Sequence, residues 1–267
     1  MYPAAFDYHA PRTLEETLAL LAELGPEAKL LAGGASLIPL LKLRLFAPTN
    51  IVDLGRVPGL DAVTLDGDGA LAIGAMVCEA DLGRAPAAAG AGVIADVVRV
   101  IGDPMVRNVG TVGGNLAHGD PANDQPAVML ALDATLVVRS AARGERTIPS
   151  ADFHLDLLVT ALEPDEVVTA IRVPASSFRP RTGSAYVKFE RQAGDLAVAG
   201  AAAVVRIGDD GRIAGARVAF TNLAPTPRRS PLIEAALTGA EATREAAEAA
   251  AGALGADELD PADDIRA

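Results

Sequence analysis

The spacing of apolar residues predicts that helices and strands alternate through the first 174 residues. Leucines recur at helical spacing over residues 14–24, behind the capping-box sequence of residues 13–16, and Gly25-Pro26 ends this helix. The next elements form a strand, a glycine turn and a helix, at residues 29–32, 33–36 and 37–43.

The same pattern divides the chain into two predicted domains. Residues 1–174 continue with strands and helices, residues 175–182 have the composition of a linker, and residues 183–267 place a sheet before two helices, as in a small α+β domain. The expected strands are 50–54, 71–75, 135–139, 167–173, 184–190, 197–206 and 213–221, with a hairpin turn at 208–211, and the expected helices are 86–101, 125–132, 232–237 and 242–254.

Composition narrows the possible functions. The chain of 267 residues is 50% hydrophobic and carries a formal net charge of −12, which excludes a general nucleic-acid binder because phosphate binding needs a basic surface. Cys78 is the single cysteine, so the chain cannot form an internal disulfide, an iron–sulfur cluster or a cysteine-based zinc site. We find no apolar run of transmembrane length and no signal peptide at residues 1–7, and we expect a cytoplasmic protein.

Two glycine-rich segments lie about 80 residues apart, at 33–36 and 110–115. Glycine lets the backbone approach a ligand closely, and successive free N–H groups before a helix form a nest that binds anions. Either segment alone is more often a structural turn, but two in one domain favour a diphosphate ligand. Residues 90–95 match the G-x-G-x-x-A dinucleotide fingerprint, yet no strand pattern precedes them, so we reject a Rossmann site there.

Polar residues after the second segment suggest a cofactor rather than a catalytic centre. His118, Asp120 and Asp124 cluster in sequence, but no second histidine lies near them, which argues against a metal. Near a phosphate nest, Asp124 more plausibly accepts hydrogen bonds from ribose or ribityl hydroxyls. With three histidines and no nucleophile–base arrangement, we expect no catalytic side chain, and a bound cofactor would perform the chemistry.

These segments resemble one known family. Residues 32–39 followed by Lys42-Leu43-Arg44 look like the first FAD-pyrophosphate loop of the medium subunits of molybdenum hydroxylases, the xanthine dehydrogenase and carbon monoxide dehydrogenase type. Residues 111–124 resemble the second loop almost letter for letter, and residues 186–191 with Gly194-Asp195 resemble the start of the family's carboxy-terminal domain. The resemblance covers essentially the whole chain.

The resemblance implies an α+β fold, in which a two-lobed FAD-binding domain of the PCMH type precedes a domain of the carbon monoxide dehydrogenase flavoprotein carboxy-terminal type. Asp124 would bind the FAD sugar chain, Ile101 and Val168 would flank the flavin or adenine, and Lys188 would lie at the isoalloxazine and tune it rather than hold the fold together. The two pyrophosphate loops would be Ala32, Gly33, Gly34, Ala35, Ser36 and Leu37, and Thr111, Val112, Gly113, Gly114 and Asn115.

The resemblance also implies partners. A small subunit with [2Fe–2S] clusters and a molybdopterin large subunit would join this chain in a dimer of heterotrimers. FAD would pass electrons from the clusters to NAD, a quinone, oxygen or another acceptor. A stand-alone FAD oxidoreductase of the same fold and a non-catalytic nucleotide-binding scaffold are the alternatives, and a purified protein that lacks flavin colour would favour the scaffold.

Overall fold

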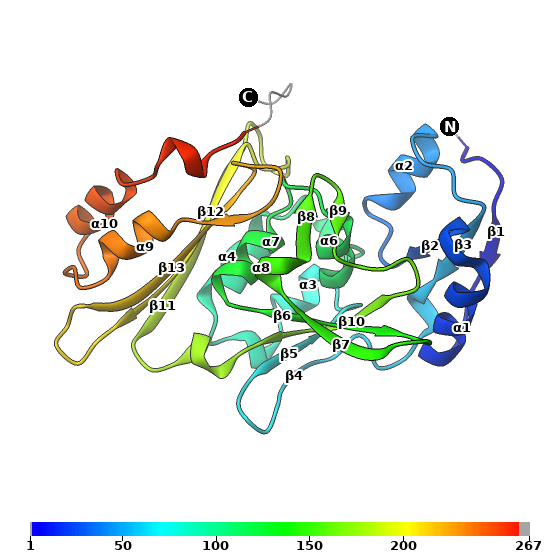
Figure 1. The fold of residues 1–267 in the computed structure, drawn as a ribbon, viewed down its shortest axis with the longest axis horizontal. Coiled ribbons are helices and arrows are strands. Elements are labelled where there is room, and N and C mark those ends of the chain that lie inside the picture. The colour runs from blue at the N-terminus through cyan, green and yellow to red at the C-terminus, as the bar shows by residue number, and fades with distance from the viewer. Residues whose placement is uncertain (1, 262–267) are drawn as a thin grey trace.

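The computed structural model describes residues 2–261 of the chain. Three units follow one another, and Figure 1 shows them side by side, from the blue amino-terminal lobe at one end to the orange helices at the other. Within the described residues, no helix combines the length and apolar character that a membrane span requires.

The first lobe is a parallel three-stranded sheet in the order β1-β3-β2. Its first helix begins as the capping pattern predicts, because the Thr13 hydroxyl accepts the N–H of Glu16 at 3.1 Å, although the Glu16 carboxylate bonds the N–H of Arg12 instead of closing the box on Thr13. The elements are β1 (Asp7–His9), α1 (Leu14–Leu24), β2 (Ala28–Leu31), α2 (Leu37–Leu43) and β3 (Asn50–Asp53).

The second lobe is an antiparallel sheet in the order β4-β5-β10-β6-β7, so its central strand arrives last in the chain. The strands are β4 (Val63–Leu65), β5 (Leu71–Gly74), β6 (Thr135–Ser140), β7 (Gly144–Pro149) and β10 (Val167–Val173), with a separate hairpin of β8 (His154–Asp156) and β9 (Val159–Thr160). The helices are α3 (Glu79–Leu82), α4 (Gly92–Val100), α5 (Pro104–Arg107), α6 (Val112–His118), α7 (Gln125–Ala131) and α8 (Ser150–Phe153).

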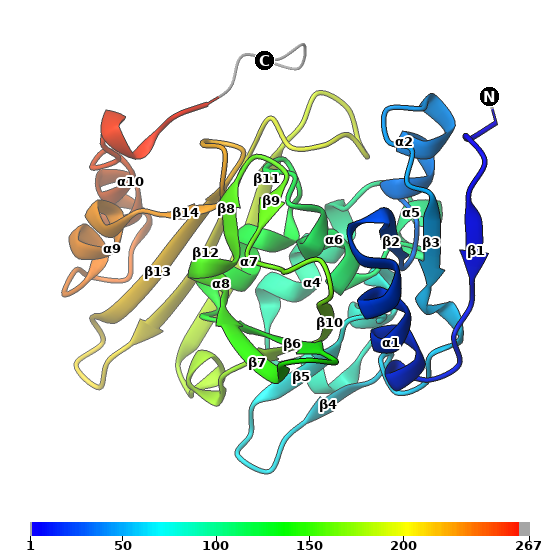
Figure 2. The ribbon, with the colours of Figure 1, turned by 45° about the vertical axis from the view of Figure 1, so that its right-hand side comes forward.

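The third unit is an antiparallel sheet in the order β11-β12-β13-β14. One face packs on α4 and α7 of the second lobe, and the two carboxy-terminal helices cover the other face, as Figure 2 shows. The elements are β11 (Thr182–Phe189), β12 (Ala199–Ile207), β13 (Ile213–Thr221), β14 (Arg228–Arg229), α9 (Pro231–Leu237) and α10 (Arg244–Ala251).

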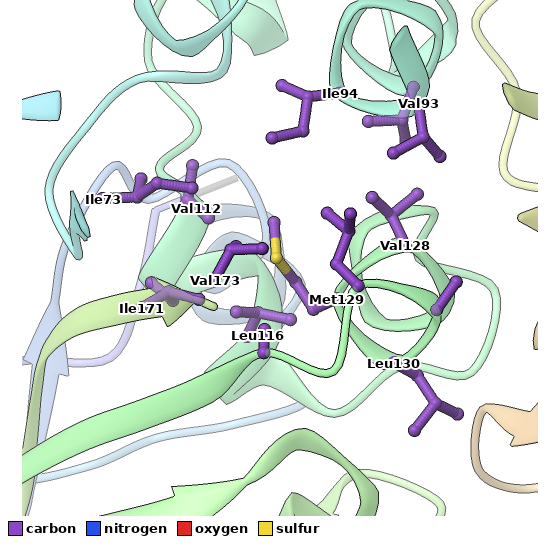
Figure 3. Packing of buried hydrophobic residues seen from close by; sticks show 14 of the residues in the cluster. Ile73, Val93, Ile94, Val112, Leu116, Val128, Met129, Leu130, Ile171 and Val173 are labelled. Atoms are coloured by element: carbon purple, nitrogen blue, oxygen red, sulfur yellow. The ribbon is translucent and has the colours of Figure 1, made fainter. Parts of the chain in front are cut away.

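One hydrophobic core joins the second lobe to the third unit. Figure 3 shows its centre, where Met129 of α7 packs near Leu116 of α6 and Val173 of β10. The same cluster includes Tyr186 and Ala202 on the inner face of the carboxy-terminal sheet. Apolar side chains of the second lobe and the third unit are therefore buried against each other, and this packing fixes the relative orientation of the two units.

Two predicted segments fold differently from the expectation. The glycine stretch 110–115 contains the first turn of α6, because the Thr111 hydroxyl caps the N–H of Gly114 and carbonyls of residues 75 and 77 accept the N–H groups of Gly113 and Val112. The expected helix 86–101 divides into a 3₁₀ turn at Pro86–Ala88 and α4. The residues directly before the fingerprint at 90–95 form this 3₁₀ turn and not a strand, as the sequence pattern predicts.

Candidate functional site

The two glycine segments meet where the first lobe contacts the second. A Cβ atom added to Gly33 would lie 1.9 Å from the carbonyl oxygen of Val109, so only glycine permits this approach of the two backbones. A Cβ on Gly114 would lie 3.4 Å from the Cβ of Ala32. Helix α6 lies beside β2 in both views of the ribbon (Figures 1 and 2). The fold therefore brings together the segments that the sequence singled out.

The first segment offers unused hydrogen-bond donors. Gly34 has a φ of +78°, a left-handed conformation that glycine adopts without strain. Within residues 2–261, no hydrogen bond takes up the backbone N–H groups of Gly34, Ala35 or Ser36, and the Ser36 hydroxyl does not cap α2. Free N–H groups in a turn before a helix form an anion-binding nest. This geometry fits a pyrophosphate.

A buried polar network lies between the second lobe and the carboxy-terminal sheet. Lys188 of β11 donates from Nζ to Oδ2 of Asp124 at 3.0 Å, and the side chains are 1% and 4% exposed. The hydroxyl of Tyr186 donates to Oδ1 of Asp124 at 2.6 Å. Both carboxylate oxygens of Asp124 are thus held by residues more than 60 positions later in the chain.

Opposing effects act on the ionisation of Asp124. Burial raises the pKa of its carboxyl group, while the charge of Lys188 and hydrogen bonds from Tyr186 and Lys188 lower it. The pKa of Tyr186 is raised, first by burial and then by the neighbouring charge of Asp124. The Tyr186 hydroxyl therefore stays neutral and continues to donate its hydrogen bond to Asp124.

The placement of Lys188 corrects one expectation. Its ammonium group also donates to the carbonyl oxygen of Val100 at 2.9 Å and lies 3.3 Å from Oε2 of Glu190. Two hydrogen bonds, to Asp124 and Val100, and the nearby carboxylate of Glu190 thus surround the ammonium group with protein oxygens. Lys188 therefore does hold the fold together, because it joins β11 to the ends of α4 and α7.

The two apolar candidates lie in the core. Ile101 ends α4 next to Val100, and its carbonyl oxygen accepts a bond from Arg107 at 2.9 Å. Val168 lies on β10, directly before Thr169, whose carbonyl oxygen accepts the N–H of Ala75. Their exposed fractions are 5% and 6%. Both belong to the core cluster that contains Val112 of the second glycine segment.

Sequence reasoning missed three polar residues of this region. Tyr186 has a detectable signal, because it lies two positions before Lys188 on a strand and so shares its face. Glu79 and Gln125 carry no such signal: their side chains are buried and hydrogen-bonded to each other across 46 positions of sequence. Only the tertiary structure shows that they meet.

We expect that Tyr186→Phe weakens the fold by about 2 kcal/mol, because it removes a buried hydrogen bond to a carboxylate while keeping the ring in the core. Urea unfolding measures this change. Tyr2→Phe is the matched control, since Tyr2 is 88% exposed. Equal unfolding midpoints for the two variants would contradict the assigned role.

Family models match nearly the whole chain. The FAD binding domain in molybdopterin dehydrogenase matches residues 4–176, and the CO dehydrogenase flavoprotein C-terminal domain matches residues 184–267. The class of protein is therefore an FAD-binding subunit of the molybdopterin dehydrogenases.

Curated relatives narrow this class. The chain is 43% identical over 267 residues to the carbon monoxide dehydrogenase medium chain of Hydrogenophaga pseudoflava. The alignment covers 100% of this chain and 91% of that protein. It is 38% identical over 262 residues to the nicotine 6-hydroxylase medium subunit of Paenarthrobacter nicotinovorans, with coverage of 98% and 89%.

Solved structures agree with the sequence comparisons. Carbon monoxide dehydrogenase from Hydrogenophaga pseudoflava matches with a TM-score of 0.93 and 44% identity, covering 100% of this chain and 91% of that chain. Quinoline 2-oxidoreductase from Pseudomonas putida 86 matches with a TM-score of 0.90 and 32% identity, covering 99% and 90%.

The chain belongs to the family of FAD-binding medium subunits of molybdenum hydroxylases. It is an oxidoreductase subunit whose cofactor is FAD and whose role is electron transfer. The predicted fold class is confirmed: an FAD-binding domain precedes a domain with an antiparallel sheet.

Proposed function

We propose that the two glycine segments hold the FAD pyrophosphate between the lobes and that the chain relays electrons from an iron–sulfur partner to a separate acceptor. The approach of Gly33 to Val109 carries this proposal, because it places the free N–H groups of residues 34–36 beside the second glycine segment, whose N–H groups at residues 112–115 are bonded within the fold. In the proposal, residues 32–37 and 111–115 surround the pyrophosphate. FAD supplies the redox chemistry, because the chain offers no redox group of its own beyond one thiol.

The remaining site residues have proposed roles that suit their placement. Each carboxylate oxygen of Asp124 retains a second lone pair beside its bond to Tyr186 or Lys188, and we propose that it accepts a hydroxyl of the FAD sugar chain. Ile101 and Val168 would exclude water at the ring systems. In the proposal, Lys188 lies near the isoalloxazine and holds the carboxylate of Asp124 in place, because its ammonium group is paired with that carboxylate.

FAD titration of the purified chain tests the cofactor site. Bound flavin has visible absorption, and we expect one FAD for each chain. A colourless chain that rejects FAD would favour the non-catalytic scaffold and would overturn the proposed site.

We further propose a small [2Fe–2S] subunit and a large molybdopterin subunit as partners, in a dimer of heterotrimers located in the cytoplasm. The composition supports an external source of electrons, since one cysteine cannot ligate a cluster. The relatives are named medium chains and subunits, which supports an assembly of several chains. The organic substrate would then bind on another chain.

We expect the isolated chain to reduce acceptors poorly with any aldehyde, purine or similar substrate. Co-expression with the two partner subunits should give one complex on size-exclusion chromatography and should restore turnover. A chain that elutes alone from this co-expression and oxidises such a substrate unaided would be a stand-alone oxidoreductase. Fractionation of the same cells tests the location.

A further inference from the structure

A buried acid and a buried amide face each other at the start of α3 and α7. Glu79 is 1% exposed and Gln125 is 0% exposed, and Nε2 of Gln125 donates to Oε2 of Glu79 at 2.7 Å. The other oxygen of each group, Oε1 of Glu79 and Oε1 of Gln125, is buried without a hydrogen-bond partner within residues 2–261. Two orphaned acceptors thus occur in one contacting pair.

One proton would satisfy both orphans. An ionised carboxylate and an amide oxygen are both acceptors and cannot bond, whereas a protonated carboxyl oxygen is a donor. Buried polar groups in folded proteins are nearly always paired. We propose that Glu79 is a neutral carboxylic acid in the folded protein, forms a two-bond acid–amide pair with Gln125, and thereby positions the second glycine segment against Asp124.

The surroundings of Glu79 favour its neutral form. Burial, the largest effect, and the charge of Asp124, the residue before α7, raise its pKa to about 8, against the hydrogen bond from Gln125. On its own segment, the neighbours are Cys78 and Asp81, which add no positive charge.

Helices α4 and α5 pack against α3, and Gln125 of α7 contacts Glu79 as described above. The charged groups of α4 are Asp96 and Arg99, which pair with each other, and Arg107 of α5 donates to the carbonyl oxygens of Ile101 and Gly102. The positive charge nearest to Asp124, Lys188, is taken up in the network described above.

The position of the pair explains why it matters for the site. The backbone N–H of Glu79 donates to the carbonyl oxygen of Gly110 at 3.0 Å, and Cys78 forms a β-bridge with Thr111. Gln125 directly follows Asp124. The pair therefore ties the second glycine segment to the carboxylate of Asp124. The relevance of this pair to FAD rests on the proposed function, whereas the protonation of Glu79 does not depend on it.

Unfolding measured without FAD tests whether Glu79 is protonated in the folded protein. The folded chain keeps a proton that the unfolded chain loses above its ordinary pKa near 4.5, so the stabilisation is fully present below that pH and is lost as pH rises to about 8. Relative to Glu79→Gln, the wild-type equilibrium constant for folding should fall about tenfold for each pH unit across this window. The glutamine cannot titrate and can form two amide–amide bonds with Gln125.

Glu15→Gln is the matched control, since the Glu15 side chain is 74% exposed. It should keep the wild-type pH dependence. Parallel pH profiles for the wild type and Glu79→Gln would overturn the proposal.

Infrared spectroscopy provides a signature that a merely structural role would not give. The wild type at neutral pH should show the carbonyl stretch of a buried carboxylic acid, and Glu79→Gln should lack it. The exchanged pair, Glu79→Gln with Gln125→Glu, keeps the same two groups and should regain both the band and the pH profile. The exchanged pair also keeps the test decisive if the single variant folds poorly, because a folded exchanged pair without the band would contradict the proposal.

FAD titration from about two pH units below this pKa to about one unit above it separates the positioning role from the proposed function. We expect wild-type affinity to fall above pH 8 and the affinity of Glu79→Gln to stay level. If both proteins bind FAD with the same pH dependence, the positioning role is wrong. If neither binds FAD, the FAD site itself is wrong, while the unfolding and infrared results still decide the proton.

Discussion

Replacing Gly114 with valine should weaken FAD binding at least about 100-fold while the chain still folds. A Cβ at this position would lie 2.7 Å from Oγ1 of Thr111, so the capping hydroxyl must move and the side chain would project toward Ala32 in the opposite glycine segment. The pyrophosphate would lose two or more charge-assisted hydrogen bonds from the free N–H groups of residues 34–36, of about 1.5–3 kcal/mol each.

Fluorescence titration with FAD measures the loss, and urea unfolding measures the cost to the fold. We expect a cost of roughly 1–2 kcal/mol, the typical value of a lost helix cap. Gly90→Val is the matched control, because a Cβ at Gly90 has open space around it. A Gly114→Val protein that retains one FAD per chain at wild-type affinity would show that the cofactor lies elsewhere.

Lys188→Met should destabilise the chain by about 3–5 kcal/mol, because it leaves the buried carboxylate of Asp124 without its positive partner. Methionine retains the apolar stem, so the loss reports the charge and its hydrogen bonds rather than a cavity. Urea unfolding of the wild type and variant gives the difference. Lys42→Met is the control at an exposed lysine.

A double-mutant cycle with Asp124→Asn isolates the pair. Because the asparagine carries no charge, the second substitution should cost much less in the Lys188→Met background than in the wild type. Additive costs would show that the two residues do not stabilise each other. The two predictions separate the site from its support: Gly114→Val should remove mainly the ligand, and Lys188→Met should weaken mainly the fold.

Local rules account for several elements. The helix at 14–24 was predictable because a hydroxyl cap and leucines at helical spacing both depend only on neighbouring residues. The strands Val167–Val173 and Ile213–Thr221 match their predicted ranges, since apolar segments bounded by turn residues indicate strands and the first is also rich in β-branched residues. Helix α6 was not predicted, because glycine disfavours helices. The structure stabilises its first turn through carbonyl oxygens of residues 75 and 77, which accept backbone N–H groups of that turn.

The sequence by itself determined which residues were candidates for the site: the two glycine segments and the carboxylate at 124 follow from residue type and local order, and the lysine at 188 follows from the resemblance to the family. The tertiary structure decided how they combine. It placed Gly33 against Val109 and joined Lys188 to Asp124 across 64 positions. It also buried Glu79 against Gln125. Contacts between distant segments depend on how two lobes and a third sheet pack, and burial then sets the strength of each charge and hydrogen bond.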